Sequence, residues 1–179
     1  MLIAEEQRHA SALGRFMDLN GIARIKRGYT DGVFRRLRNL FGSLEVSIAV
    51  LVTAELIAKV YYPALRAATQ SSVLRRTCEL IEREEISHVE FQTEQLARLR
   101  SGRPGAVICA THWLQRLLFY PTIFVVGLSH RRALGCGGLS LGQFWLRCRR
   151  EFLDAIVQMD PRKRSIERRS HQPAISPAR

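Results

Sequence analysis

The sequence predicts an all-α protein, an antiparallel helix bundle with extra helices at its C-terminal end. Three observations indicate this class. Apolar residues recur at helical spacing over most of the 179-residue chain, strand-type alternation is scarce, and serine, glycine and proline residues mark the ends of long segments. A chain of this length can bury a sizeable core, so we expect one folded domain with appendages.

Three helices are expected in the first hundred residues. The first runs to about Leu19 and ends at Asn20-Gly21, a pair that offers a left-handed C-cap. The second begins near Ser43 and meets Pro63, where we expect a kink or a stop. The third is capped by Ser71 or Ser72 and ends at Ser101-Gly102. Residues 22 to 42 are basic and rich in glycine, and we interpret them as the connection across the bundle.

The character of the chain changes after Arg103-Pro104-Gly105. Residues 106 to 130 are hydrophobic, but the apolar run is shorter than the roughly twenty residues that span a bilayer, so we expect a docked core helix or an interfacial segment. A glycine-rich turn region follows at 129 to 142, and then a basic helix over 141 to 159. The predicted organisation is a helical bundle over 1–102, a helical extension over 103–160 and a disordered basic tail over 161–179.

Acidic and imidazole side chains interrupt the apolar faces of the three N-terminal helices. Glu6/His9 and Glu85/His88 are Glu-x-x-His pairs whose members share one helix face, and Glu55 is surrounded by apolar residues. A buried ionised carboxylate must be protonated, paired or bound to a cation, and three together favour a cation. The predicted inward residues are Leu2, Glu6, His9, Leu13 and Phe16; Ile48, Leu51, Val52, Glu55, Ala58 and Tyr62; and Cys78, Ile81, Glu85, His88, Gln92, Leu96 and Leu99.

Some alternatives stay open from the residues alone. A single Glu-x-x-His pair on a helix is common and usually binds nothing. Glu5 and Glu84 adjoin the candidate ligands and would face inward if their helices were rotated, although the three-residue spacing selects Glu6 and Glu85. Tyr62 is either a hydrogen-bond partner of a ligand or an ordinary core tyrosine.

The order of these motifs resembles the ferritin-like di-iron carboxylate superfamily. That family's four-helix bundle carries a Glu, a Glu-x-x-His, a Glu and a second Glu-x-x-His, and the last three elements match Glu6/His9, Glu55 and Glu85/His88. The phrase AEEQRHASALGRFMD also resembles the second helix of small bacterial ferritin-like proteins. The resemblance covers about residues 1 to 100, and the family's opening helix has no counterpart.

The resemblance implies a site for two iron ions, with manganese as an alternative. Glu6 and Glu85 would bridge the two metals, His9 and His88 would each bind one, and Glu55 would be a terminal ligand. In this ligand set one metal lacks a ligand. We therefore expect either that the natural chain begins upstream of Met1, or that this protein is a degenerate relative of the family and binds metal weakly. The implied function is a di-iron oxidoreductase that activates oxygen or peroxide, or a protein that handles iron.

Charge and cysteine content suggest partners and compartment. The net charge is +12, and residues 101–179 hold 13 basic and 4 acidic residues, so residues 106–159 could contact an anionic membrane, as a non-catalytic bundle would. Nonspecific contact with nucleic-acid phosphates and a merely solvated basic face are the alternatives, although no specific nucleic-acid motif is present, and a homodimer is a separate expectation. The four widely spaced cysteines favour reduced thiols, and together with the lack of a signal-peptide pattern they predict a cytoplasmic protein, with a peripheral position on a membrane as the alternative.

Overall fold

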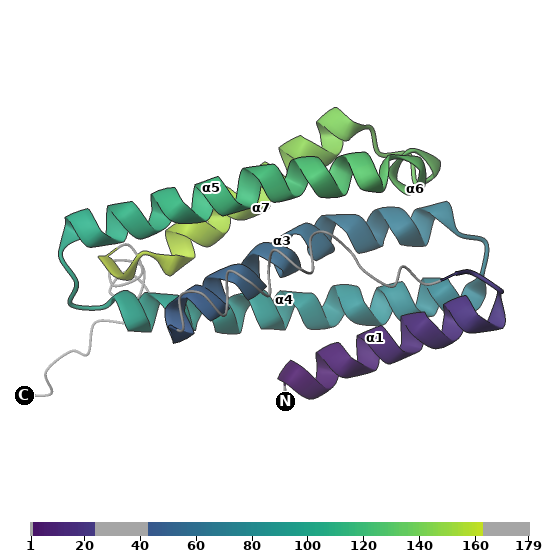
Figure 1. The fold of residues 1–179 in the computed structure, drawn as a ribbon, viewed down its shortest axis with the longest axis horizontal. Coiled ribbons are helices and arrows are strands. Elements are labelled where there is room, and N and C mark those ends of the chain that lie inside the picture. Colours follow the sequence, from purple (N-terminus) through teal and green to yellow (C-terminus); the bar gives the residue numbers. More distant parts are fainter. Residues whose placement is uncertain (1, 24–42, 163–179) are drawn as a thin grey trace, which may run out of the picture.

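Every regular element in the described part of the chain is a helix. The computed structural model describes residues 2–23 and 43–162, so the predicted connection and the predicted basic tail lie almost entirely outside it. The helices are α1 (Leu2–Leu19), α3 (Leu44–Ala68), α4 (Ser72–Arg100), α5 (Gly105–Ser129), α6 (Arg131–Cys136) and α7 (Leu141–Met159), as Figure 1 shows. The all-α prediction is therefore confirmed for these residues.

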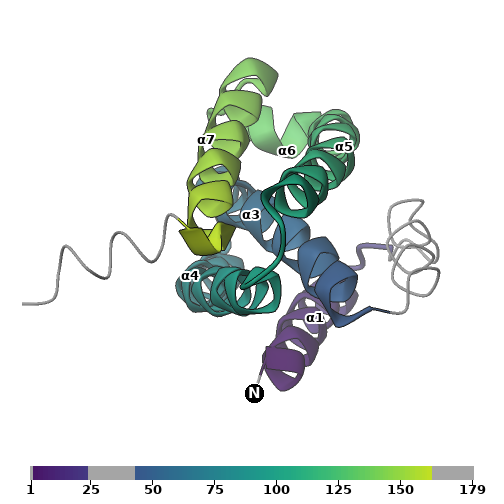
Figure 2. The same ribbon diagram turned by 90° about the vertical axis from the view of Figure 1, so that its left-hand side faces the viewer.

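The helices α3 and α4 form an antiparallel pair at the centre of the molecule. Helix α1 lies along one side of this pair, whereas α5 and α7 lie on the other side (Figure 2). Helices α1 and α3 run in the same direction and α4 runs against both (Figure 1). This arrangement turns one face of the central pair toward α1 and the opposite face toward α5 and α7.

The predicted helix ends agree with the structure. The hydroxyl of Ser43 accepts a hydrogen bond from the backbone of Val46 at the start of α3, and Ser71 caps α4 in the same way. Gly21 and Gly102 follow α1 and α4 with φ values of 64° and 76°, a left-handed conformation that glycine adopts without strain.

Two details of the predicted turns differ from the structure, whereas a kink at Pro63, the other expected outcome there, stays a prediction. Helix α3 does not stop at Pro63 but continues to Ala68, because Val60 and Ala64 on either side of the proline are buried in the core. Part of the glycine-rich region also folds as the short helix α6, whose Leu134 is fully buried. The chain then passes close to α3 at Gly137, where a Cβ atom would lie 2.2 Å from the carbonyl oxygen of Ala64.

The main hydrophobic core lies between the central pair and the C-terminal helices. The rings of Phe119 and Phe152 stack there with centroids 4.1 Å apart, and Leu56 and Leu96 are buried beside them. The predicted boundary at residue 102 falls in the loop between α4 and α5, but residues from both sides of it form this one core. Helices α5 to α7 are thus packed as part of the bundle.

A buried arginine joins three helices at one end of the bundle. The Arg100 side chain is only 1% exposed, and its guanidinium donates to Glu45 (Nε to Oε1, 2.9 Å) and to Gln115 (Nη2 to Oε1, 3.3 Å). Arg103 donates to the second oxygen of Glu45 at 2.6 Å. Burial lowers the pKa of Arg100, which the adjacent carboxylate counteracts. Glu45 therefore neutralises a charge that water cannot reach.

The structure also bears on membrane and redox expectations. Among the described helices, none has both the length and the apolar character needed to cross a bilayer. All four cysteines are free thiols, with Cys78 and Cys148 buried and Cys109 and Cys136 exposed. The absence of disulfides was predicted from their spacing, whereas the cytoplasmic location stays a prediction.

We expect Glu45→Ala to destabilise the protein by about 3 kcal/mol or more, because it leaves the Arg100 guanidinium buried without a counter-charge. Urea unfolding followed by circular dichroism measures this change. Arg98→Ala is the matched control, since the Arg98 side chain is 66% exposed in its ion pair with Glu94, and its effect should stay within about 0.5 kcal/mol. Equal effects of the two substitutions would contradict this account of the Arg100 network.

Candidate metal centre

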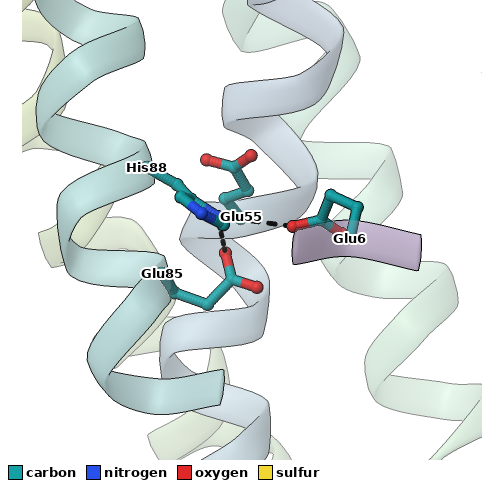
Figure 3. Close-up of side chains that lie close together, drawn as sticks. All are labelled: Glu6, Glu55, Glu85 and His88. Carbon is teal, nitrogen blue, oxygen red and sulfur yellow. Dashed lines mark ion pairs between the residues drawn. The ribbon is translucent and has the colours of Figure 1, made fainter. Parts of the chain in front are cut away.

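Four of the five predicted ligands converge between α1, α3 and α4. Each of Glu6, Glu55, Glu85 and His88 offers one ligand-type atom, and these four atoms all lie within 4.8 Å of one another. Figure 3 shows the side chains pointing toward a common centre, from α1, from α3 and twice from α4. Glu55, Glu85 and His88 are buried, whereas the Glu6 side chain remains 44% exposed. The group is therefore closed on the α3 and α4 sides and reached by solvent at α1.

Helix geometry accounts for this convergence. Glu85 and His88 are three residues apart, so both project from the same face of α4. Helix α1 runs antiparallel to α4 and brings Glu6 to that face, while the central pairing of α3 with α4 supplies Glu55. Three helices thus bring together acids that are 30 to 79 residues apart in the sequence.

Each of the four side chains keeps a buried polar atom without a hydrogen-bond partner among the described residues. These atoms are Glu6 Oε1, Glu55 Oε2, Glu85 Oε2 and His88 Nδ1. An unsatisfied buried polar atom costs about 1–3 kcal/mol, and more when it is charged. A cation at the common centre would satisfy all four at once, so the donor set fits a metal ion.

His9 lies at the edge of this group rather than within it. Its Nδ1 is 3.7 Å from Glu6 Oε1 and 3.9 Å from Glu85 Oε1. The corresponding Nδ1 of His88 is 3.3 Å from Glu6 Oε1 and 3.9 Å from the other oxygen of Glu85, Oε2. Glu85 thus presents one oxygen to each imidazole, an arrangement suited to a carboxylate shared by two cations.

The glutamates before each predicted bridging residue bind the far side of the imidazoles. His9 Nε2 lies 2.5 Å from Glu84 Oε2, and His88 Nε2 lies 3.0 Å from Glu5 Oε2. The contacts between the two Glu-Glu-x-x-His segments are therefore reciprocal: the histidine of each segment contacts the first glutamate of the other segment, across α1 and α4. The rotated alternative does not hold, because Glu6 and Glu85 face the centre while Glu5 and Glu84 occupy outer positions.

These outer contacts determine how the histidines are presented. A carboxylate can only accept a hydrogen bond, so the Nε2 that contacts it carries a proton and Nδ1 faces the centre. The sequence contained a signal for this pairing, since both motifs begin with two successive glutamates. Spacing within one helix could not reveal which histidine each outer glutamate contacts, because that depends on the direction of the neighbouring helix.

Two further residues adjoin the site. Gln92, which was predicted to face inward without a role, donates a hydrogen bond from Nε2 to Glu55 Oε1. The pKa of Tyr62 is raised by burial and, to a smaller extent, by the negative charge of Glu85. Tyr62 therefore interacts electrostatically with the site. Within the described residues its hydroxyl donates no hydrogen bond to a proposed ligand, so its contact with the ligands stays a prediction.

The carboxyl groups disfavour one another's ionisation. Burial raises the pKa of Glu55 to about 9, and the charge of Glu85 adds to this, while the hydrogen bond from Gln92 opposes it. Burial also raises the pKa of Glu85 to about 8, with Glu6 and Glu84 contributing. Glu84 differs, because the hydrogen bond with His9 and the charge of Arg8 hold its pKa below the usual value despite burial. Without a cation, the raised pKa values favour the protonated forms of Glu55 and Glu85 at neutral pH.

Comparison of the chain with protein-family models, with curated proteins and with solved structures finds no match. The assignment of this centre therefore depends on its geometry and chemistry.

We expect the stability of the metal-free protein to fall as pH rises from about 4.5 to about 9. Over this window the unfolded chain ionises Glu55 and Glu85 while the folded protein keeps them protonated, so the folded state binds more protons and is disfavoured by rising pH. Glu55→Gln should reduce this slope and stabilise the metal-free protein at pH 8 by roughly 1–3 kcal/mol.

Chemical denaturation of chelator-treated protein at several pH values measures these slopes. Glu90→Gln is the control, because Glu90 is an exposed acid on the same helix as Glu85 and its loss should leave the slope unchanged. An identical pH dependence in the parent and in Glu55→Gln would show that the Glu55 carboxyl is not held protonated by the fold.

Proposed function

We propose that this protein is a di-iron carboxylate protein of the ferritin-like type, an oxidoreductase that activates oxygen or peroxide or oxidises and handles iron. The observation that carries the proposal is a set of four buried atoms at one centre that have no hydrogen-bond partner among the described residues, three from carboxyl groups and one from an imidazole. Oxygen and imidazole donors without a thiolate suit iron or manganese. Cys78, the cysteine predicted nearest to this face, is not among the grouped atoms.

The directions of the helices support the same proposal. If α1, α3 and α4 correspond to the second, third and fourth helices of a ferritin-like bundle, then the first two of these must run parallel and the last antiparallel. The observed directions agree with that requirement (Figure 1). The connection between α1 and α3 lies mostly outside the described residues, but its 24 residues, 20 to 43, are long enough to return along the bundle.

Each residue would have a distinct part in holding the metals. Glu55 and His88 would bind the first ion, His9 would bind the second, and Glu6 and Glu85 would be shared. When bound, a pair of iron ions supplies one- and two-electron chemistry with oxygen or peroxide. Gln92 orients Glu55, and the exposed side of Glu6 gives small reactants a route to the centre.

The two proposed ion positions differ in the number of donor groups that the described residues supply. Four donors converge at the first, whereas His9 shares only Glu6 and Glu85 at the second. Because affinity rises with the number of well-placed donors, the first ion should bind more tightly than the second. This inequality makes the contributions of the histidines separable.

We expect metal-free protein to bind a first Fe(II) or Mn(II) ion tightly and a second more weakly. Glu85→Ala should abolish both events because Glu85 is shared, whereas His9→Ala should remove only the second. Anaerobic titration with Fe(II), followed by elemental analysis after desalting, measures both steps. Glu79→Ala, an exposed acid on the same helix, is the control and should leave uptake intact. Uptake that is negligible in the parent, or equal in Glu85→Ala, would falsify the proposed metal centre.

The outer glutamates should affect the two steps selectively. Glu5→Gln is expected to lower the affinity for the first ion by about 10–100-fold, because Glu5 contacts the distal nitrogen of His88. Glu84→Gln should lower the affinity for the second ion by a similar factor, because Glu84 contacts His9. Competition with a chelator of known affinity measures each constant. If both substitutions weaken both ions equally, the pairing of each glutamate with one position is wrong.

A further inference from the structure

Helix α5 presents an apolar surface on the side that does not face the core. Its buried side includes Ile108, Phe119 and Ile123, of which Phe119 and Ile123 belong to the main hydrophobic core. On the opposite side, seven large apolar residues are each between 41% and 67% exposed. We name these the α5 stripe, which consists of Val107, Trp113, Leu114, Leu117, Phe124, Val125 and Leu128.

The α5 stripe is continuous along the helix. Trp113, Leu117, Phe124 and Leu128 follow one another at intervals of four and seven residues, so they lie on one face. From Val107 to Leu128 this face extends for about 32 Å at 1.5 Å per residue. Scattered exposed apolar residues are ordinary, but a contiguous strip of this length is typical of an interaction surface.

The apolar surface continues from α5 onto the start of α7. A groove of about 230 Å³ lies between the two helices, and Phe124 and Leu128 of the stripe form part of its wall. No charged side chain lines it. The lining residues are Ile123, Phe124, Gly127, Leu128, Leu141, Gly142, Phe144 and Trp145.

The segment that contains the stripe carries charge of one sign in its sequence. Between residues 104 and 150 the chain contains no aspartate or glutamate but six arginines, all at least partly exposed, whereas Arg103 just before it is paired with Glu45. Arg116 lies over the Trp113 ring at 5.8 Å from its centroid, so a cation directly adjoins the stripe. The six are Arg116, Arg131, Arg132, Arg147, Arg149 and Arg150.

We propose that the α5 stripe docks on the surface of an anionic lipid membrane, with the helix in the plane of the interface. A bilayer surface satisfies both features, since apolar side chains enter the boundary between headgroups and acyl chains while arginines contact lipid phosphates. The indole of Trp113 suits this boundary, because its ring is apolar and its N–H can reach a polar partner.

Other occupants fit less well. A second copy of the chain packed stripe to stripe would bring like-charged arginines together, in a protein whose net charge is already +12. A nucleic acid would match the charge but would leave the apolar strip against a phosphate backbone. The combination of an apolar strip with a segment whose sequence from 104 to 150 carries arginines and no acids therefore favours lipid.

Vesicle binding of the full chain tests the proposal. Sedimentation should show binding to phosphatidylcholine vesicles that contain phosphatidylglycerol, with weaker binding to phosphatidylcholine alone and at raised salt. Trp113 fluorescence should shift to shorter wavelength on binding. The double substitution Leu114→Ser and Leu117→Ser should weaken binding by at least about tenfold, because it removes two exposed anchors from the interface.

Phe91→Ser is the matched control, since Phe91 is a 53% exposed apolar residue on α4, outside the stripe, and its loss should leave binding unchanged. All altered side chains are exposed, and circular dichroism checks that each variant is folded. No binding of the parent to anionic vesicles would overturn the proposal, as would equal binding of the double variant. A dimer in solution that the double variant abolishes would assign the stripe to a second copy instead. The readout is independent of metal content, so it stands or fails separately from the metal centre.

Discussion

The docking of α1 depends on polar contacts with α4. Among residues 4 to 19, the buried ones are His9 and Gly14, whereas Leu13, Phe16 and Met17 are only partly buried. The helix is held instead by contacts between the two Glu-Glu-x-x-His segments and by the ion pair of Arg8 with Glu84. Both histidines that would bind metal take part in these contacts, so binding of a cation and docking of α1 are thermodynamically linked. Without a cation, protonation of Glu55 and Glu85 reduces the repulsion between these two carboxyl groups.

Local signals in the sequence predicted most helix boundaries. Hydroxyl caps at Ser43 and Ser71 act within four residues, and a left-handed Gly21 or Gly102 requires no partner, so neither needs knowledge of the fold. The stop expected at Pro63 does not occur, because the effect of a proline on a helix depends on the packing around it. In α3 the neighbouring core residues are buried. Helix α6 was missed for a similar reason, since its six residues are fixed by contacts with distant segments.

The candidate centre was predictable to the extent that helix periodicity fixes directions. Spacing selected Glu6, Glu55, Glu85 and His88, and the structure brings these four together. His9 was predicted on the same terms but lies at the margin, because its distance from the others depends on how α1 crosses α4. Contacts such as that of Gln92 with Glu55 depend on the register of α3 against α4, which no pattern within one helix specifies.

Helix α5 shows a different limit of sequence reasoning, and its position has a consequence for the metal centre. A helix that is apolar on every side gives no periodic signal, so its sequence could not tell the core face from the exposed face. In the structure, α1 and α5 lie on opposite sides of α3 (Figure 2). If the α5 stripe rests on a membrane, α3 lies between α5 and α1, the helix that carries the partly exposed Glu6. Docking would then leave the approach of dissolved metal ions and small reactants unobstructed, so one molecule can perform both proposed roles at the same time.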